Sequence, residues 1–300
     1  MRSTSIHNLN ADKGLNILEK PLYLLLNFIN NLFPYSNLDK RIVFKSFGDF
    51  NWEKEWDKTY QTSSVGRRLS DLFWRTLPWA KIKAELGEIH IFDTGCGSGN
   101  YGVRINDASG GIATYTGVDA KEKSNWALLR KKYPNFRFIE SRSTNIRSLI
   151  PPDTNLFITQ SAIEHFGEDL LFFEQISEYI EKSLRPVIQV HIFPAARALP
   201  LYLFHGVRQY TPRTISQITR MFDASNFTLF GLGGKAGGRV HWKYFTWPML
   251  VLRQKARWSD DPVSYEKAVR KAIESDCLRP NRPPLFWALI IHSHSKNEIW

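Results

Sequence analysis

The chain alternates short apolar runs with amphipathic stretches from about residue 89 onward. The runs have the length of buried strands, and the stretches between them carry hydrophobic residues at helical spacing. Alternating strands and helices are typical of a parallel sheet with helices on both faces, so we expect a doubly wound α/β fold. The predicted strands are 89–93, 114–119, 136–140, 155–160 and 187–192, and the predicted helices include 168–183.

The two ends of the chain add elements to this core. Apolar strands are predicted at 227–232 and 285–293, and the pair Thr211–Pro212 predicts the start of a helix shortly before them. Residues 235–284 form an insertion between these strands that is rich in glycine, then aromatic and basic, and then helical from an Asp261 cap. Residues 1–85 are predicted to form a helical extension or cap, which leaves 86–300 as the main domain.

Residues 18–33 predict an amphipathic helix near the N-terminus. Three asparagines interrupt the segment, which is shorter than the roughly 20 residues of a membrane span. We expect its apolar stripe to pack on the core or on a second copy of the chain, with a membrane surface as the alternative. The stripe consists of Leu18, Leu22, Leu25, Ile29, Leu32 and Phe33.

Composition narrows the class of protein. The net charge is +11, and residues 235–284 hold eleven Lys/Arg against five Asp/Glu. This local excess favours an anionic partner, although a solvated basic face explains it equally well. Cys96 and Cys277 are too few for a disulfide framework, and no zinc-ligand spacing or secretory signal occurs, so we expect a cytoplasmic protein.

The most specific motif is IHIFDTGCGSGNYG at 89–102, in which a strand ends at an acid and three alternating glycines follow. Glycines there let a backbone approach a ligand closely. The nicotinamide fingerprint needs its third glycine at position 100, where this chain has Asn100. Asp93 suits a cofactor with an ammonium group better than a pyrophosphate. A second acid, Asp119, ends the next strand, where a carboxylate can accept both hydroxyls of an adenosine ribose.

Together these residues resemble motifs I and II of the class I S-adenosylmethionine-dependent methyltransferases, over about residues 50–230. The resemblance implies a Rossmann-like, seven-stranded, mostly parallel sheet with a C-terminal antiparallel hairpin. It also implies S-adenosylmethionine (SAM) as cofactor and S-adenosylhomocysteine (SAH) as product. The family often has an acidic residue near the adenine, but this chain has SRSTNI there, so Ser143, Thr144 or Asn145 could accept that hydrogen bond. The cofactor-binding residues expected on this basis are Arg67, Asp93, Thr94, Gly95, Cys96, Gly97, Gly99, Asp119, Ala120, Ser143, Thr144, Gln160 and Ser161.

Further candidates come from the same resemblance. The stretch NLFITQSAIEHF resembles motif IV and suggests Glu164 and His165 as an acid/base pair, with a purely structural role for the pair as the alternative. Arg67 or Arg68 could bind the carboxylate of the cofactor. The region around them, with Trp56, Tyr60, Ser64 and Gly66, resembles a pre-motif segment that closes over that carboxylate. The expected substrate residues are His191, His205, Arg208 and Tyr210.

The sequence therefore predicts a SAM-dependent methyltransferase that acts by in-line transfer, with oxygen of a small molecule or glycan, possibly anionic, as acceptor. The alternatives are an RNA methyltransferase that uses the basic insertion and a SAM-binding scaffold without activity. TQSA replaces the NPPY-like tetrad of exocyclic-amine enzymes, which argues against the commonest nucleic-acid acceptors. No metal is expected, because Asp169 is the one aspartate near the fourth strand.

Overall fold

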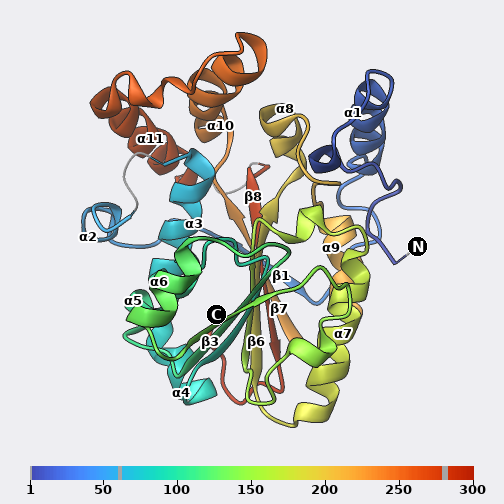
Figure 1. The fold of residues 1–300 in the computed structure, drawn as a ribbon, viewed down its shortest axis with the longest axis vertical. Helices are drawn as coiled ribbons and strands as arrows, with labels where there is room; N and C mark the ends of the chain where they lie inside the picture. The colour runs from blue at the N-terminus through green and yellow to red at the C-terminus, as the bar shows by residue number, and fades with distance from the viewer. Residues whose placement is uncertain (1, 60–62, 279–282) are drawn as a thin grey trace.

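The computed structural model describes residues 2–59, 63–278 and 283–300, and its centre is an eight-stranded sheet (Figure 1). All neighbouring strands pair in parallel except those beside β8, which runs antiparallel to both β6 and β7. The order is β1-β7-β8-β6-β5-β2-β3-β4. This confirms the expected α/β fold with a mostly parallel sheet and antiparallel C-terminal strands. The strands are β1 (Ile42–Ser46), β2 (His90–Thr94), β3 (Thr114–Asp119), β4 (Phe136–Glu140), β5 (Leu156–Gln160), β6 (Val187–Pro194), β7 (Ser225–Leu232) and β8 (Phe286–Ser293).

Helices cover both faces of the sheet, so the central strands are buried on both sides (Figure 1). Helices α3 to α6 lie on one face and α7 and α9 on the other, and each layer has its own hydrophobic cluster. The α-helices are α1 (Glu19–Asn30), α2 (Trp52–Trp56), α3 (Val65–Thr76), α4 (Trp79–Leu86), α5 (Asn100–Ser109), α6 (Asn125–Lys132), α7 (Asp169–Ser183), α8 (Leu199–Tyr202), α9 (Pro212–Thr219), α10 (Lys235–His241) and α11 (Pro262–Cys277). Single turns and a π-helix complete the chain: η1 (Ala11–Lys13), η2 (Arg147–Leu149), η3 (Ile163–His165), η4 (Ala196–Ala198), η5 (Trp242–Val251) and η6 (Arg257–Ser259).

The first strand corrects the expected domain boundary and strand number. Residues 1–85 are not wholly helical, because β1 lies among them and pairs in parallel with β7 at the edge of the sheet. Its burial explains why the hydrophobic pattern did not predict this strand: Ile42 is buried, and the four residues after it are exposed. An edge strand with one buried residue has no apolar alternation to detect.

The orientation of α1 corrects a second expectation. Tyr23 and Asn27 lie on its buried face, and the predicted apolar stripe points outward. Polar contacts hold this arrangement: the Tyr23 hydroxyl donates to the backbone oxygen of His205 at 2.8 Å, and Arg213 donates to the backbone oxygen of Asn30. The prediction that the apolar stripe packs on the core was therefore wrong.

The segment between β7 and β8 forms a lobe of α10, η5, η6 and α11 beside α3 (Figure 1). Asp276 of α11 ties its two ends together, since its carboxylate accepts the backbone N–H groups of Ala236 and Gly237 at 3.0 and 2.7 Å. The Asp261 carboxylate caps α11 by accepting the N–H of Ser264, as predicted. Within the part of the chain that is described, no helix has the length and apolar character of a membrane span.

Candidate functional site

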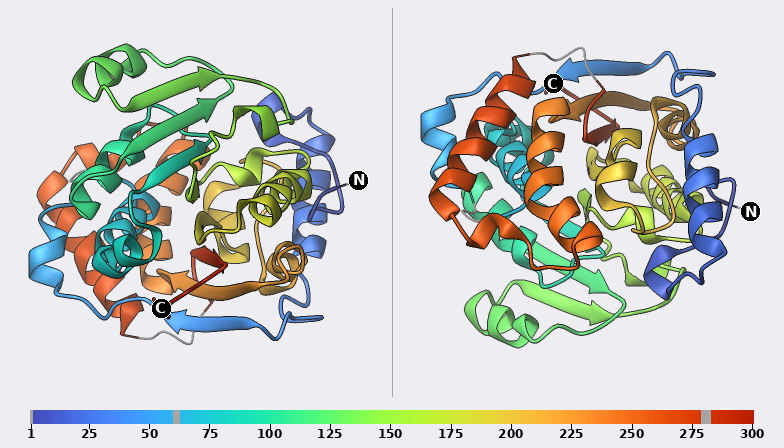
Figure 2. Two further views of the ribbon diagram at one scale, coloured as in Figure 1. Left: turned by 90° about the horizontal axis from the view of Figure 1, so that it is seen from below. Right: turned by 90° about the horizontal axis from the view of Figure 1, so that it is seen from above.

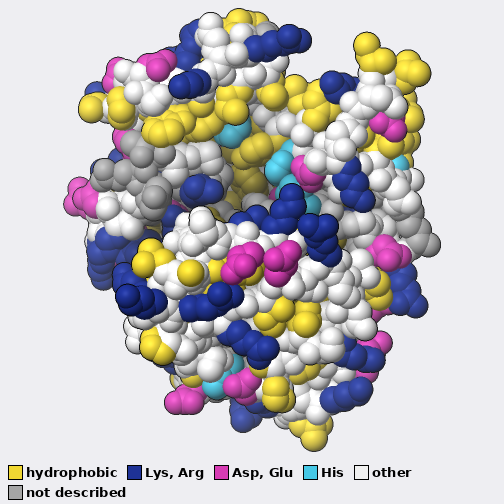
Figure 3. Space-filling view, in the orientation of Figure 1, with side chains coloured by type: hydrophobic (Ala, Val, Ile, Leu, Met, Phe, Trp, Pro, Cys, Tyr) yellow, Lys and Arg dark blue, Asp and Glu magenta, His cyan; other side chains and the backbone are white. Residues whose placement is uncertain are grey.

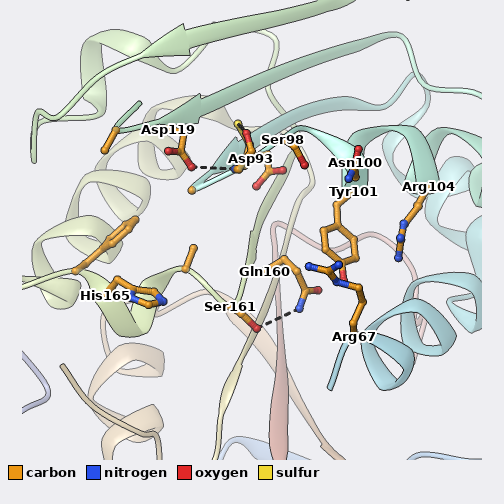
Figure 4. Close-up of a pocket in the computed structure, with 16 residues that line it drawn as sticks. Arg67, Asp93, Ser98, Asn100, Tyr101, Arg104, Asp119, Gln160, Ser161 and His165 are labelled. Carbon is orange, nitrogen blue, oxygen red and sulfur yellow. Dashed lines mark hydrogen bonds between the residues drawn. The ribbon is translucent and has the colours of Figure 1, made fainter. Parts of the chain in front are cut away.

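Three neighbouring cavities open at the carboxyl ends of β2, β3 and β5, and Figure 4 shows the residues that line the central one. The central cavity has a volume of about 490 Å³. A second cavity of about 200 Å³, here the Ser143 cavity, shares Gly95, Asp119 and Ala120 with it. A third of about 270 Å³, here the His205 cavity, shares walls with it on the opposite side. The shared residues there are Arg67, Tyr101, Gln160 and Ser161.

The glycine turn forms the floor of the central cavity. Gly95 and Gly97 both have positive φ, 77° and 54°. A Cβ built on Gly97 would meet no described atom within 4 Å, because that side of the backbone faces the open cavity. Gly99 departs from the expected role: it is not among the lining residues, and a Cβ there would strike the Phe138 ring at 2.5 Å. Gly99 is thus required by packing at the start of α5.

Asp93 is almost fully buried, yet it lines the central cavity. Its Oδ2 accepts a hydrogen bond of 2.6 Å from the Tyr115 hydroxyl, whereas its Oδ1 has no hydrogen-bond partner among the described residues. Burial raises the pKa of this carboxyl to about 7, and the Tyr115 hydrogen bond only partly opposes the rise. An unpaired buried carboxylate oxygen is a strong site for a cationic donor.

Asp119 stands between the central cavity and the Ser143 cavity. Its Oδ2 accepts the backbone N–H of Gly97 at 2.9 Å, which fixes the carboxylate against the glycine turn (Figure 4). Its Oδ1 accepts the backbone N–H of Lys121 at 3.3 Å and lies 3.5 Å from Nζ of Lys123. A carboxylate has about four lone-pair sites, so the group can accept further donors. The neighbouring Ser143 cavity holds four other predicted residues, Thr94, Ala120, Ser143 and Thr144.

Another part of the wall comes from α3 and from the start of α5, which follows the glycine turn directly. Arg67 lines both the central and the His205 cavities, and its head lies near the Tyr101 ring in Figure 4. Arg68 does not reach them: its side chain is fully buried, pairs with Glu266 and lies over the Trp56 ring. Tyr60, which belongs to the same predicted region, lies outside the described residues.

The structure adds cavity residues that the sequence reasoning missed. Ser98, Asn100, Tyr101 and Arg104 line the central cavity from the turn and the first turns of α5. A signal was available, since these residues directly follow the glycine motif, and a helix that starts at the end of a parallel strand has its N-terminus at the edge where cavities form. Cys96 also lines the cavity, and burial raises the pKa of its thiol well above the ordinary value, which fits a small filler.

Gln160 and Ser161 join the central cavity to the His205 cavity at the end of β5. The Gln160 amide donates to the Ser161 hydroxyl at 3.4 Å (Figure 4). It also donates to the Ser70 hydroxyl at 2.8 Å, and its oxygen accepts from the Trp74 indole at 2.9 Å. Ser161 has a φ of 48°, an uncommon conformation for a non-glycine residue. The strand therefore ends in a fixed, strained turn between the two cavities.

Glu164 and His165 follow on η3, where the N-terminal extension contributes an unexpected partner. The Nδ1 of His165 forms a short hydrogen bond with Oδ2 of Asp12, and Asp12 in turn accepts the N–H of Gly206 at 3.3 Å. Glu164 Oε1 lies 3.9 Å from the Nε2 atoms of both His165 and His205. Asp12 thereby holds the imidazole by its Nδ1, and the His165 side chain lines the central cavity.

The pKa values in this cluster follow from burial and mutual charge. Burial raises the pKa of Glu164 to about 7, and the charge of His165 opposes the rise. Burial and then the charge of His165 lower the pKa of His205. Burial alone would raise the pKa of Asp12, but the hydrogen bond and charge of His165 outweigh it and lower it. Glu164, His165 and His205 each offer a ligand atom within 4.8 Å of the others, so the absence of a metal stays a prediction.

Three expected substrate residues lie away from the cavities. His191 is completely buried in the sheet, where it pairs with Thr159 and packs against the Phe173 ring. Arg208 and Tyr210 are also buried, and both contact the Asp169 carboxylate. None of the three lines a described cavity, so their contacts are structural. Of the four predicted residues, His205 alone is found in a wall.

No protein-family model matches the chain, and no curated protein matches it. Solved structures do. The plantazolicin methyltransferase BamL, in complex with a triazolic desmethylPZN analog and SAH, is 15% identical over 81% of this chain and 89% of its own, with a TM-score of 0.47. The plantazolicin methyltransferase BpumL is 13% identical over 92% of this chain and 99% of its own, at 0.47. A SAM-dependent methyltransferase from Archaeoglobus fulgidus is 16% identical over 73% and 94%, at 0.40. With TM-scores this low, these likenesses carry no argument for an activity.

Proposed function

We propose that the chain is a SAM-dependent methyltransferase and that SAM occupies the central and Ser143 cavities. The observation that carries this proposal is the unpaired Oδ1 of Asp93 in the cavity wall, with the Asp119 carboxylate at the end of the next strand. An ammonium group can pair with the Asp93 oxygen, and two ribose hydroxyls can donate hydrogen bonds to the Asp119 carboxylate. A cofactor that carries both groups fits the pair, because the two side chains line the same cavity.

The remaining residues fit the other parts of this cofactor. The small Ser143 cavity offers the Ser143 and Thr144 hydroxyls for an adenine, beside the apolar side chains of Ile146 and Phe172. Gly97 leaves the space that a Cβ would fill, so the backbone can approach the ligand. Arg67 is placed to bind a carboxylate at the other end. Bound there, SAM supplies an electrophilic methyl group on a sulfonium.

The acceptor then belongs in the His205 cavity, with its reacting hydroxyl extending past Ser161 into the central cavity, where His165 is a wall residue. Its volume of about 270 Å³ suits a small molecule or one end of a larger one. We infer that His165 is the general base: Nδ1 is held by Asp12, so Nε2 can take the proton of an acceptor hydroxyl. An O-methyltransferase acting on a small molecule or glycan is the activity that this arrangement supports best.

Isothermal titration with SAM and SAH tests the cofactor, with NADH as the matched dinucleotide control. We expect heat from SAM and SAH and none from NADH. Absence of binding by SAM and SAH would refute the proposal, and binding of NADH alone would replace it with a nicotinamide site.

A second experiment separates an active enzyme from a silent SAM-binding protein. Small hydroxylated and glycosidic compounds are incubated with SAM, and methylated products are sought by mass spectrometry. For any acceptor found, His165→Gln should lower kcat by on the order of 100-fold while the Kd for SAM stays within about twofold. An unchanged kcat would refute the general-base role.

A further inference from the structure

Helix α1 and the loop after it expose an unusual run of large apolar side chains. Leu25 is 54% exposed, Phe28 59% and Phe33 77%. Single exposed hydrophobic residues are common, but a contiguous set on one helix face marks an interaction surface. The face, here the α1 face, consists of Ile17, Leu18, Leu22, Leu25, Phe28, Ile29, Leu32, Phe33 and Tyr35.

The rest of the protein fixes this face outward. The buried side of α1 packs the Tyr23 ring edge-on against His7 and beside Phe204, and the Tyr23 hydroxyl donates to a backbone oxygen. Arg213 holds the C-terminal end of the helix through the backbone oxygens of Asn30 and Pro34, the latter by its own N–H at 2.7 Å. Turning the apolar stripe inward would break these contacts.

A second apolar patch lies on η5 in the lobe between β7 and β8. Its exposed side chains are accompanied by positive charge: residues 235–259 contain six Lys/Arg and no Asp/Glu. All six basic residues are exposed. Tryptophan with arginine and lysine is the composition of segments that lie in the interface of an anionic membrane. The patch, here the η5 patch, consists of Trp242, Trp247, Met249, Leu250 and Leu252.

Helix α1 and the lobe that contains η5 lie at the same end of the molecule, on opposite sides of α8 (Figures 1 and 2). Figure 3 shows hydrophobic side chains at the tip of α1 and along the lobe, with a hollow between them in which histidine side chains are visible. Tyr202 of α8 lines the His205 cavity, and the Thr246 hydroxyl of η5 donates to the backbone of Leu201 at 2.6 Å. The η5 patch therefore belongs to an element that packs on α8, which forms part of the wall of this cavity.

We propose that this end of the protein docks on an anionic lipid surface through the α1 face and the η5 patch. Charge complementarity favours an anionic lipid surface, because the η5 patch is flanked in sequence by basic residues alone, and a second copy that packed its own η5 patch there would bring two basic segments together. Each Lys or Arg near an anionic leaflet adds about 1 kcal/mol of attraction, while the apolar side chains insert at the level of the headgroups. This docking is independent of the proposed cofactor.

Flotation of the whole protein with vesicles tests the proposal, using phosphatidylcholine alone and phosphatidylcholine mixed with phosphatidylglycerol. We expect binding to the anionic vesicles that falls with added salt. The double variant Leu25→Gln, Phe28→Gln should weaken binding at least about tenfold. Leu128→Gln, Leu184→Gln is its matched control, since these leucines are 62% and 87% exposed on other elements and should leave binding unchanged.

The charge is tested separately with Arg253→Gln, Lys255→Gln against the control Lys131→Gln, Arg137→Gln, all four residues being exposed. The first pair should lower affinity for anionic vesicles by about 30-fold and the control should not. Failure of the wild type to float with anionic vesicles would overturn the proposal. A dimer in light scattering that Leu25→Gln, Phe28→Gln dissociates, without vesicle binding by the wild type, would assign the α1 face to a second copy.

Discussion

Replacing Asp93 by Asn should weaken the cofactor site and strengthen the fold at the same time. The wild-type carboxyl is buried, and its pKa is raised to about 7 from the 3.8 of an unfolded chain. The folded state therefore holds this proton more tightly than the unfolded state does. Stability is lost as the pH rises from about 4 to about 7, and above that range the full penalty for the buried charge applies.

The magnitudes follow from two different interactions. A pKa difference of about 3 units corresponds to about 4 kcal/mol, which is an upper limit for the penalty at pH 8. An Asn amide keeps an acceptor for the Tyr115 hydroxyl but places an N–H₂ group at the site of the unpaired oxygen, at a cost of about 1–3 kcal/mol. We expect a net gain of about 1–3 kcal/mol at pH 8. A lost ammonium contact weakens SAM binding by about 10- to 150-fold.

Urea denaturation between pH 4 and pH 8 and calorimetric titration with SAM measure the two effects. The stability advantage of Asp93→Asn over the wild type should grow with pH up to about 7 and then stay constant. Asp223→Asn, which removes an exposed carboxylate, controls for the change in net charge. A stability difference that does not vary with pH, or unchanged SAM affinity, would refute the reasoning.

Three further predictions concern the surroundings of the site. Asp12→Asn removes the partner of His165, so kcat should fall by about 10- to 100-fold in a methyl-transfer assay with the Kd for SAM unchanged; an unaltered kcat would contradict the orienting role. Gly97→Ala adds a methyl group in the open cavity, so calorimetry should show weaker SAM binding. Gly99→Ala places a methyl group against the Phe138 ring, so its free energy of unfolding in urea should be about 1–3 kcal/mol lower than that of Gly97→Ala. Asp169→Asn leaves a buried guanidinium without its partner and should cost about 3–5 kcal/mol in urea denaturation; a loss below about 1 kcal/mol would contradict this.

Sequence reasoning located the strands because most of them are buried on both faces. Each predicted strand from 89–93 to 285–293 overlaps an observed one within a few residues, since apolar runs bounded by turn residues and helices leave little ambiguity. The caps Thr211 and Asp261 were equally clear, because a side-chain acceptor followed by proline has one local explanation. The edge strand β1 has neither a fully buried apolar run nor a capping residue followed by proline.

The site was predictable where it depends on strand ends and not where it depends on distant contacts. Asp93 and Asp119 could be expected at one cavity because parallel strands bring their carboxyl ends to one edge of the sheet, and both line the central cavity. Asp12 was missed because 153 residues separate it from His165, and no spacing rule connects a short N-terminal turn to the end of β5. The prediction that His191 contacts the substrate was wrong because β6 continues to Pro194. His191 therefore lies inside the strand, with its ring in the core.

The direction of α1 shows a more general limit. Helical periodicity establishes that a helix has an apolar stripe, but it does not say what the stripe faces. In this chain the opposite side supplies Tyr23 and backbone acceptors to partners on residues 204–213, which come more than 150 residues later. Buried polar groups must form hydrogen bonds, which are directional, whereas exposed apolar side chains leave no hydrogen bond unmade. Polar contacts within the chain therefore decided the orientation, and they left the apolar face available to a surface outside it.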